Sequence, residues 1–364
     1  MLSVHKIELK PNNKQKTHFT KACGVARFSY NWALNQWQQQ YKAGDKPTEA
    51  SLRRQLNAIK KIEYPWMLEV TKVAPQQAIK DLGSAFKRFF NKKSQYPKFK
   101  KKGIRDSFRA DNGPAKKGEN SVELKNKKIN LPRIGWINLK EQLRFTGQIK
   151  SVVISRKANR WFAAISVETE NLPHERKNHG CVGVDLGIKA LATLSNGKII
   201  TGAKSHTVLL KKLRRNSKQL SHKKKGSKNF TKAARKLSCL HARIANIRND
   251  SLHQLTTELV LHNTTIGIED LNVKGMLANR KLSRHIADQS FYEFRRQLEY
   301  KGKWYGSKII VADRFFPSSK MCSSCGVVNK DLKLSQRNWL CQCGINHDRD
   351  LNAAINLEKF ASTG

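Results

Sequence analysis

The chain has 364 residues, which is too long for one ordinary domain and enough for two or three. Its 71 lysines and arginines stand against 27 acidic residues, a formal net charge of +44. Such an excess repels itself in the folded state unless a polyanion neutralises it, so nucleic acid is the expected partner. Hydrophobic residues make up 38% of the chain, which excludes wholesale disorder.

Apolar runs and cysteine usage bear on where the chain works. No stretch of about 18 consecutive apolar residues occurs, and the first residues lack the apolar core of a signal peptide, so no membrane span or secretion is expected. Four of the seven cysteines crowd into residues 322–343, which is typical of a metal site in a reducing compartment. We expect a cytoplasmic protein.

The first half of the chain reads as a β-rich body interrupted by a helical block. Residues 2–9 alternate between apolar and polar side chains, which predicts a strand. Apolar residues three or four apart then predict helices over about 19–41, 48–61 and 75–90. From 120 to 168 the alternation returns, with two strands meeting at a turn near Ala158-Asn159. Together with the first strand, these predict a small β-barrel.

Residues 91–109 form a basic segment that also carries aromatic residues and Pro/Gly breaks. It predicts a loop that grips phosphates while Tyr96, Phe99 or Phe108 stacks on bases. The alternative is that these rings anchor a surface loop to the core.

The second half alternates strands with helices. After a polar candidate linker at 171–180, an apolar strand carries Asp185, and Asn196-Gly197 favours a hairpin turn. The later elements are expected to be helices over 205–262 broken by a basic loop at 223–229, a strand at 264–271, a helix marked by Phe291 and Leu298, a strand at 308–313, and a closing helix in DLNAAINLEKFA. This order is typical of α/β folds.

Two cysteine pairs predict a closed metal site. Cys322 and Cys325 are followed by Cys341 and Cys343, and four thiolates joined by a hairpin can complete a tetrahedral Zn²⁺ site. Each pair precedes a glycine, which allows a sharp turn with N–H groups facing the sulfurs. The second pair is one residue shorter than Cys-x2-Cys, so His347 stays open as a substitute for Cys343. An iron–sulfur cluster is a further alternative. Four thiolates leave no open position, so this zinc should be structural.

Acidic residues are scarce, so the positions of three of them are informative. Asp185 lies in the apolar strand VGVDLG, Glu269 ends the strand IGIED, and Asp350 begins the last helix. A carboxylate in such a strand is costly unless it is paired or binds a metal. Taken alone, either strand acid could form a salt bridge, and Asp350 could simply favour the helix N-terminus. Asp348 is expected to be the N-cap of that helix.

The three carboxylates together predict phosphodiester hydrolysis with two metal ions. Two Mg²⁺ ions about 3.5–4 Å apart stabilise the attacking water and the leaving oxygen in such sites. Mg²⁺ prefers oxygen ligands whereas thiolates suit zinc, so CQCGINHDRDLNAA is interpreted as parts of two sites. Folding of the zinc site is expected to fix where the last helix begins and so to place Asp350 opposite Asp185 and Glu269.

The sequence resembles the TnpB family, RNA-guided nucleases encoded by bacterial and archaeal insertion sequences and related to the type V CRISPR effectors. The resemblance rests on GVDLGIKALATLSNG, IGIEDL, CSSCG, WLCQCG and HDRDLNAAINL in this order, with RFSYNWAL and YPKFKKKGIRDSFR in the first half. It covers essentially the whole chain. It implies catalytic, Mg²⁺-binding roles for Asp185, Glu269 and Asp350, and structural zinc at the paired cysteines.

The resemblance also implies a multidomain α+β architecture. Residues 1–10 and 104–172 would form a wedge-like β-barrel around a helical recognition insertion at 11–103. The rest would be a RuvC nuclease domain of RNase H-like fold at 179–316 and 346–364, with a zinc ribbon inserted at 317–345. Such a protein would work at the prokaryotic nucleoid.

The implied function is cleavage of DNA matched to a guide RNA that derives from the element's own transcript. The target would be double-stranded or single-stranded DNA, and base pairing with the guide would recognise its sequence. Positively charged channels would bind the nucleic-acid backbones. Two alternatives stay open. A transposase or accessory transposition protein would use a similar trio without RNA, and a non-cleaving RNA-guided regulator should lack at least one of the three acids.

Overall fold

The computed structural model describes residues 2–111, 122–170, 180–333 and 335–363. The chain divides into two compact units, Met1–Glu170 and Asn171–Gly364. Each unit has a hydrophobic core of its own. The division falls at the polar segment predicted as a linker, of which residues 171–179 lie outside the described part of the chain.

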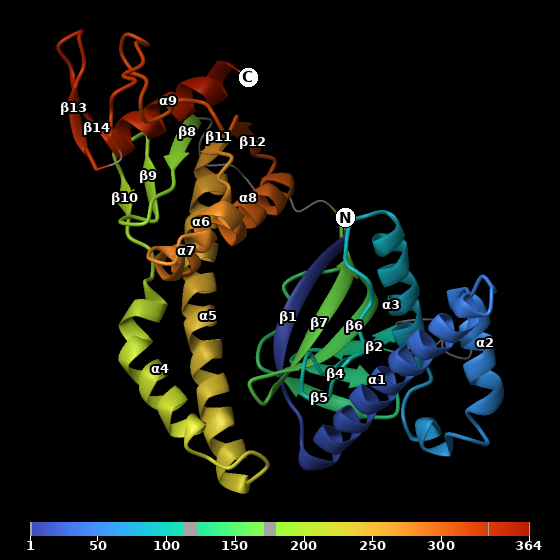
Figure 1. The fold of residues 1–364 in the computed structure, drawn as a ribbon. Coiled ribbons are helices and arrows are strands. Elements are labelled where there is room, and N and C mark those ends of the chain that lie inside the picture. The colour runs from blue at the N-terminus through green and yellow to red at the C-terminus, as the bar shows by residue number, and fades with distance from the viewer. Residues whose placement is uncertain (1, 112–121, 171–179, 334, 364) are drawn as a thin grey trace. The chain divides into compact units, whose positions relative to one another are not determined.

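The first unit is an antiparallel sheet with a helical block inserted after its first strand (Figure 1). The helical block holds α1 (Asn13–Lys42), α2 (Glu49–Ile59), the 3₁₀ helix Pro65–Glu69 and α3 (Val73–Phe90). The strands are β1 (Leu2–Lys10), β2 (Ser107–Asp111), β3 (Glu123–Lys125), β4 (Lys128–Leu131), β5 (Gly135–Leu139), β6 (Gln148–Lys157) and β7 (Arg160–Glu168), in the order β2-β6-β7-β1-β5-β4-β3. The predicted strand, helix and hairpin positions are therefore confirmed.

Local chemistry explains why these elements begin and turn where they do. Asn12 and Gln15 form a capping box at the start of α1, in which each side chain accepts a hydrogen bond from the other residue's backbone. Ala158 and Asn159 both have positive φ angles, 48° and 65°, as a two-residue turn between β6 and β7 requires. Phe19 of α1 packs against the sheet through contacts with the buried rings of Phe108 in β2 and Trp161 in β7.

The predicted base-stacking role is wrong for Phe108. This ring lies in β2, is 3% exposed, and packs 5.9 Å from Phe19 between centroids, so it is a core residue. Tyr96 contacts Phe86 and Phe89 edge-on at 5.5 and 5.2 Å and also serves as an anchor. Tyr96 at 41% and Phe99 at 50% exposed both keep an accessible face, so the stacking prediction stays open for these two rings.

Barrel closure in the first unit stays a prediction. Among the described residues the ladder runs from β2 to β3, and these two edge strands are not paired with each other.

The second unit is built on a mixed five-stranded sheet of order β10-β9-β8-β11-β12. Its strands are β8 (Gly180–Asp185), β9 (Ala192–Leu194), β10 (Ile199–Ile200), β11 (Asn263–Glu269) and β12 (Lys308–Ala312). β8, β11 and β12 run parallel, and β9 runs antiparallel to β8. This confirms the α/β order expected for the second half.

Helices surround this sheet and extend from it (Figure 1). They are α4 (Ser205–Ser221), α5 (Lys228–His262), α6 (Val273–Ala278), α7 (Ser283–Gln289), α8 (Phe291–Tyr305) and α9 (Arg349–Thr363). α4 and α5 form a long hairpin that projects from the sheet, joined at the predicted basic loop. A small hairpin of β13 (Asn338–Leu340) and β14 (Asn346–Asp348) precedes α9.

Within the described ranges, no helix combines the length and apolar character that a membrane span requires.

Candidate functional site

Two of the predicted acids end neighbouring parallel strands. Asp185 is the last residue of β8, and Glu269 is the last residue of β11. In the ladder between them Ile268 pairs with Val184, so each acid directly follows the last matched pair. Residues at matching positions of paired strands point to the same face of a sheet. The two carboxylates therefore leave the same end of the sheet on the same side.

A glycine stands two residues before each acid and faces the same side. Gly183 and Gly267 pair with each other, and residues i and i+2 of a strand share a face. A Cβ atom on Gly183 would lie 1.8 Å from the carbonyl oxygen of Ala354, and one on Gly267 would lie 2.3 Å from that of Leu357. The backbone of α9 thus lies directly against both strands, where no side chain intervenes.

This close approach brings the third acid to the other two. Asp350 is in the first turn of α9, whose start is fixed by Asp348, since the Oδ1 atom of Asp348 accepts a hydrogen bond of 2.9 Å from the Leu351 N–H. The expected N-cap role of Asp348 is confirmed. Ala353 and Ala354 are fully buried against the sheet, as their size predicted.

The electrostatics of Asp185 reflect this grouping. Its burial raises the pKa of its carboxyl well above the ordinary value, and the charges of Glu269 and Asp350 raise it further. Arg349 and Arg337 offset part of this rise. Among the described residues no lysine or arginine forms an ion pair with Asp185 or Glu269, so the salt-bridge alternative is wrong for both strand acids.

The other two acids each have one partner from the segment before α9. Asp350 accepts hydrogen bonds of 3.1 and 3.3 Å from Nη1 of Arg337, which immediately precedes β13. Oε1 of Glu269 accepts a hydrogen bond from the Ser318 hydroxyl. Ser318 is buried, so its hydroxyl can fix the orientation of the partly buried Glu269 carboxylate.

Asp270, next to Glu269, has a different role. Its carboxylate pairs with Arg295 at 2.6 Å and with Arg314 at 2.7 Å, and these hydrogen bonds lower the pKa of Asp270. Both arginines, with Glu269, line a cavity of about 450 Å³. Asp270 therefore orients two cations at the edge of the site, which sequence reasoning missed.

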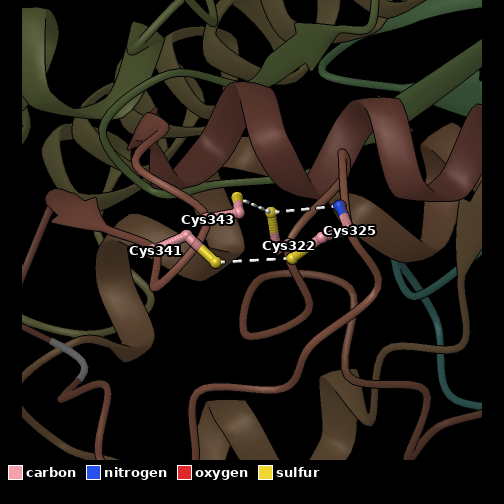
Figure 2. Close-up of side chains that lie close together, drawn as sticks. All are labelled: Cys322, Cys325, Cys341 and Cys343. Carbon is pink, nitrogen blue, oxygen red and sulfur yellow. Dashed lines mark hydrogen bonds between the residues drawn. The ribbon is translucent and has the colours of Figure 1, made fainter.

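The four predicted cysteines meet in one cluster (Figure 2). Their Sγ atoms all lie within 4.8 Å of one another, with Cys322 to Cys343 at 3.7 Å and Cys325 to Cys341 at 3.6 Å. Zn–S bonds of about 2.3 Å in a tetrahedron give an S···S edge of roughly 3.8 Å. The cluster therefore fits a four-thiolate zinc ion.

The two cysteine turns repeat one backbone pattern. In the first turn the Cys322 N–H donates to the Val327 carbonyl, and the Gly326 N–H donates to the Cys322 carbonyl. In the second turn, which is one residue shorter, the Cys341 N–H donates to the Ile345 carbonyl and the Gly344 N–H donates to the Cys341 carbonyl. Both glycines have positive φ angles, 77° and 85°, as predicted. The Cys325 N–H points at the Cys322 sulfur at 3.5 Å. The short second spacing is thus accommodated by a tighter turn.

His347 stands beside the cluster. Its Nε2 lies 3.0 Å from the Cys322 sulfur, and its ring packs 4.9 Å from Trp339 between centroids. Burial alone would raise the pKa of the Cys322 thiol, but the N–H groups of Cys325 and Ser324 and the His347 ring lower it to about 5. His347 therefore stabilises the thiolate form of Cys322. The cluster that fits a metal ion consists of the four cysteine sulfurs.

Two asparagines of α9 tie the cysteine turn to the acids. Asn352 accepts from the Ser323 N–H at 2.9 Å and donates to the Met321 carbonyl at 2.8 Å. Asn356 donates to the carbonyls of Ser318 and Met321 at 2.8 and 2.6 Å. Both asparagines are 1% exposed. Sequence reasoning missed this network, although asparagines four apart in the otherwise apolar LNAAIN were a readable signal.

Three family models match parts of the chain. One described as a probable transposase of the IS605 OrfB type matches residues 164–280. A model of the Cas12f1-like TNB domain matches residues 291–357, and a helix-turn-helix model matches residues 1–46.

Full-length relatives decide the family. A protein of Streptomyces pristinaespiralis with the provisional name RNA-guided DNA endonuclease is 37% identical over 353 residues, which cover 95% of this chain and 86% of that protein. The chain belongs to the TnpB family. Another relative, InsQ of Escherichia coli K12, carries the same provisional name and is 34% identical, covering 98% of this TnpB chain and 91% of InsQ.

A solved structure extends the likeness to the fold. A Cas12f1 complex with sgRNA and target DNA, determined by cryo-EM, matches with a TM-score of 0.63 over 95% of this chain and 83% of that chain, at 17% identity. The mixed α/β architecture of this TnpB protein is thus shared. In the part matched as helix-turn-helix, residues 2–46 hold β1 and the single helix α1.

Proposed function

We propose that the chain is an RNA-guided DNA endonuclease that hydrolyses guide-matched DNA at Asp185, Glu269 and Asp350. The observation that carries the proposal is the grouping of three carboxylates from β8, β11 and α9 on one side of the sheet, close enough that two of them raise the pKa of the third. The names of the full-length relatives support guidance by RNA.

Asp185, Glu269 and Asp350 would hold divalent cations, because mutually repelling, partly buried carboxylates suit a hard cation. Bound Mg²⁺ would activate water and stabilise the leaving oxygen during phosphodiester hydrolysis. Glu269 would be oriented by Ser318, and Asp350 would be released by Arg337. Arg295 and Arg314, held by Asp270, would bind phosphates of the DNA strand beside the site.

The finer architecture belongs to this proposal. A meander of β8, β9 and β10 followed by two parallel strands supports an RNase H-like, RuvC-type domain at 179–316 and 346–364. Residues 317–345 would be its zinc ribbon. The sheet of the first unit would be the wedge (1–10 and 104–172), with the recognition insertion at 11–103. The net charge of +44 suits a protein that holds guide RNA and both forms of DNA.

Zinc at Cys322, Cys325, Cys341 and Cys343 is proposed as structural. Metal analysis of the purified chain should find one zinc ion per chain, and mild EDTA should stop cleavage without removing it. Cys343→Ser should lose the zinc, whereas His347→Gln should keep it. Zinc retained by Cys343→Ser but lost by His347→Gln would show that the histidine is the fourth ligand.

A cleavage experiment tests the main proposal. The chain is purified with the RNA that it binds in cells expressing it beside its flanking DNA, and is then given guide-matched DNA and Mg²⁺. Cleavage should depend on the guide match and should be abolished in Asp185→Ala. Asp313→Asn is a matched control, since Asp313 lies just after β12, is exposed, and accepts a hydrogen bond from the Phe315 N–H. Cleavage that survives Asp185→Ala would refute the site.

The same experiment separates the alternatives. A transposase, which the description of one family model would suit, should bind element ends without co-purifying RNA. A non-cleaving regulator should bind guide-matched DNA and leave it intact. RNA-dependent cutting is expected instead.

A further inference from the structure

The helical hairpin of α4 and α5 carries a cavity that lies apart from the acids and the cysteines. The cavity has a volume of about 540 Å³ and lies between the two helices. Its rim carries five cations, Lys212 from α4 and Lys232, Arg235, Lys236 and Arg243 from α5. Between Asp185 and Asp250 the sequence contains no aspartate or glutamate, so α4 and the part of α5 that lines the cavity carry no acid to neutralise these cations. This charge favours an anionic ligand.

Asn216 adds a second, independent feature. It lies on α4 in the row of residues that faces α5, it is 2% exposed, and it lines the cavity. Neither its amide nitrogen nor its amide oxygen has a hydrogen-bond partner among the described residues. A buried amide without partners is costly, so a ligand that satisfies both atoms would be favoured there.

The two features together describe a nucleotide. A carboxamide offers one donor and one acceptor side by side, which matches the edge of a base. The cavity wall beside it includes Leu240 and Cys239, an apolar surface suited to the flat face of a base. Lysines and arginines around the mouth suit the flanking phosphates.

We propose that this cavity binds one unstacked base of single-stranded RNA, with Asn216 contacting the base edge and the cationic rim contacting the neighbouring phosphates. RNA is the assigned class because sequence-specific RNA recognition uses bases splayed out of loops and bulges, and a guide RNA would supply them. The assignment of the base to the guide rests on the proposed function, whereas the pocket itself does not.

Binding of short RNAs by the full chain, stripped of nucleic acid at high salt, tests the pocket without guide, target or Mg²⁺. The probes are oligo(A), oligo(C) and oligo(U) of about ten nucleotides, a length within the usual single-strand site size. The wild type should bind the most tightly bound of the three RNAs at least about fivefold more tightly than the most weakly bound one. Fivefold is about the smallest difference in affinity expected when a side chain pairs with the edge of a base. Asn216→Leu keeps the volume and removes the amide, and should reduce this spread to within about twofold.

Two further variants sharpen the result. Asn216→Ser stays polar but cannot offer the paired donor and acceptor, so it should behave like Asn216→Leu, with both folds verified by circular dichroism. Lys236→Gln should weaken the binding of all three RNAs. It should also lower the slope of log affinity against log salt concentration by about 0.7, the value for one phosphate contact on a single strand. Lys224→Gln makes the same charge change in the loop beside the cavity and should alter the slope less.

Several outcomes would overturn the proposal. One is a wild-type spread below about twofold, and another is a spread that survives both Asn216 variants, in which case Asn216 only sets the register of two helices. Tighter binding of the matching DNA oligonucleotides would overturn the assignment to RNA. This binding experiment does not measure cleavage. Its result therefore tests the pocket even if the endonuclease proposal fails.

Discussion

Gly183 of β8 and Ala354 of α9 approach so closely that a methyl group on the glycine would overlap the alanine carbonyl oxygen, at 1.8 Å. Gly267 of β11 has the same relationship with Leu357. In both strands the pattern is glycine, one residue, then acid. The glycines set how near α9 can lie, and so they set the reach of Asp350.

Gly183→Ala should therefore damage the site without removing any of its acids. The added methyl meets helix backbone, which cannot rotate away, so α9 must shift and stability should fall by about 1–3 kcal/mol. For a unit of this size each kcal/mol lowers the melting temperature by about 2–4 °C. Gly180→Ala lies in the same strand with open space around its Cβ position and serves as the control. Equal melting temperatures and equal cleavage in the two variants would contradict this account.

Ser318→Ala should slow cleavage while leaving the cysteine cluster and RNA binding intact. The variant removes the hydroxyl that donates to Glu269, and loss of such a supporting hydrogen bond typically costs about 10–100-fold in metal affinity or activity. A Mg²⁺ titration of the cleavage rate, together with zinc content, measures the effect. Ser324→Ala, exposed in the cysteine turn, is the control. An unchanged Mg²⁺ requirement in Ser318→Ala would show that Glu269 does not depend on this contact.

Arg337→Gln should lower the Mg²⁺ concentration needed for half-maximal cleavage. The guanidinium occupies Asp350 and competes with a cation there, and an exposed ion pair of this kind is worth up to about 1 kcal/mol, or about fivefold. Lys330→Gln is the control, because it removes a charge from the same segment and Lys330 pairs with no acid in the part of the chain that the structure describes. If Arg337→Gln needs more Mg²⁺ than Lys330→Gln, the arginine assists metal binding instead of opposing it.

The cleavage rate should show an acidic limb that responds to Mg²⁺. Burial and the charges of Glu269 and Asp350 raise the pKa of Asp185, so the folded site holds a proton at a pH where an ordinary aspartate would not. Activity should fall as the pH drops through this raised pKa, because a cation must displace the proton. More Mg²⁺ should move the limb to lower pH. A limb that stays in place at all Mg²⁺ concentrations would assign it to another group.

Much of this arrangement follows from the sequence because its signals are local. Alternation and helical spacing predicted the elements, and apolar strands ending in Asp185 and Glu269 predicted that these acids group together, since a buried carboxylate is costly unless it is paired or binds a metal. The cysteine spacing predicted the cluster, because two close pairs joined by a hairpin can supply four thiolates to one metal ion.

The parts that were missed depend on contacts distant in sequence. Nothing around Phe108 shows that its ring meets Phe19, so a core residue resembled a base-stacking one. Ser318 resembles any loop serine until the fold brings it to Glu269. The cavity at Asn216 exists only because α5 returns alongside α4.

The late position of α9 in the chain has a consequence for synthesis. The first unit and the strands that carry Asp185 and Glu269 leave the ribosome before Asp350 exists, and α9 can settle on Gly183 and Gly267 only once its own residues have emerged. A nascent chain, or one ended early by a stop codon, would carry Asp185 and Glu269 and lack Asp350. Under the proposed function, the site would therefore be complete only after translation has passed the last helix.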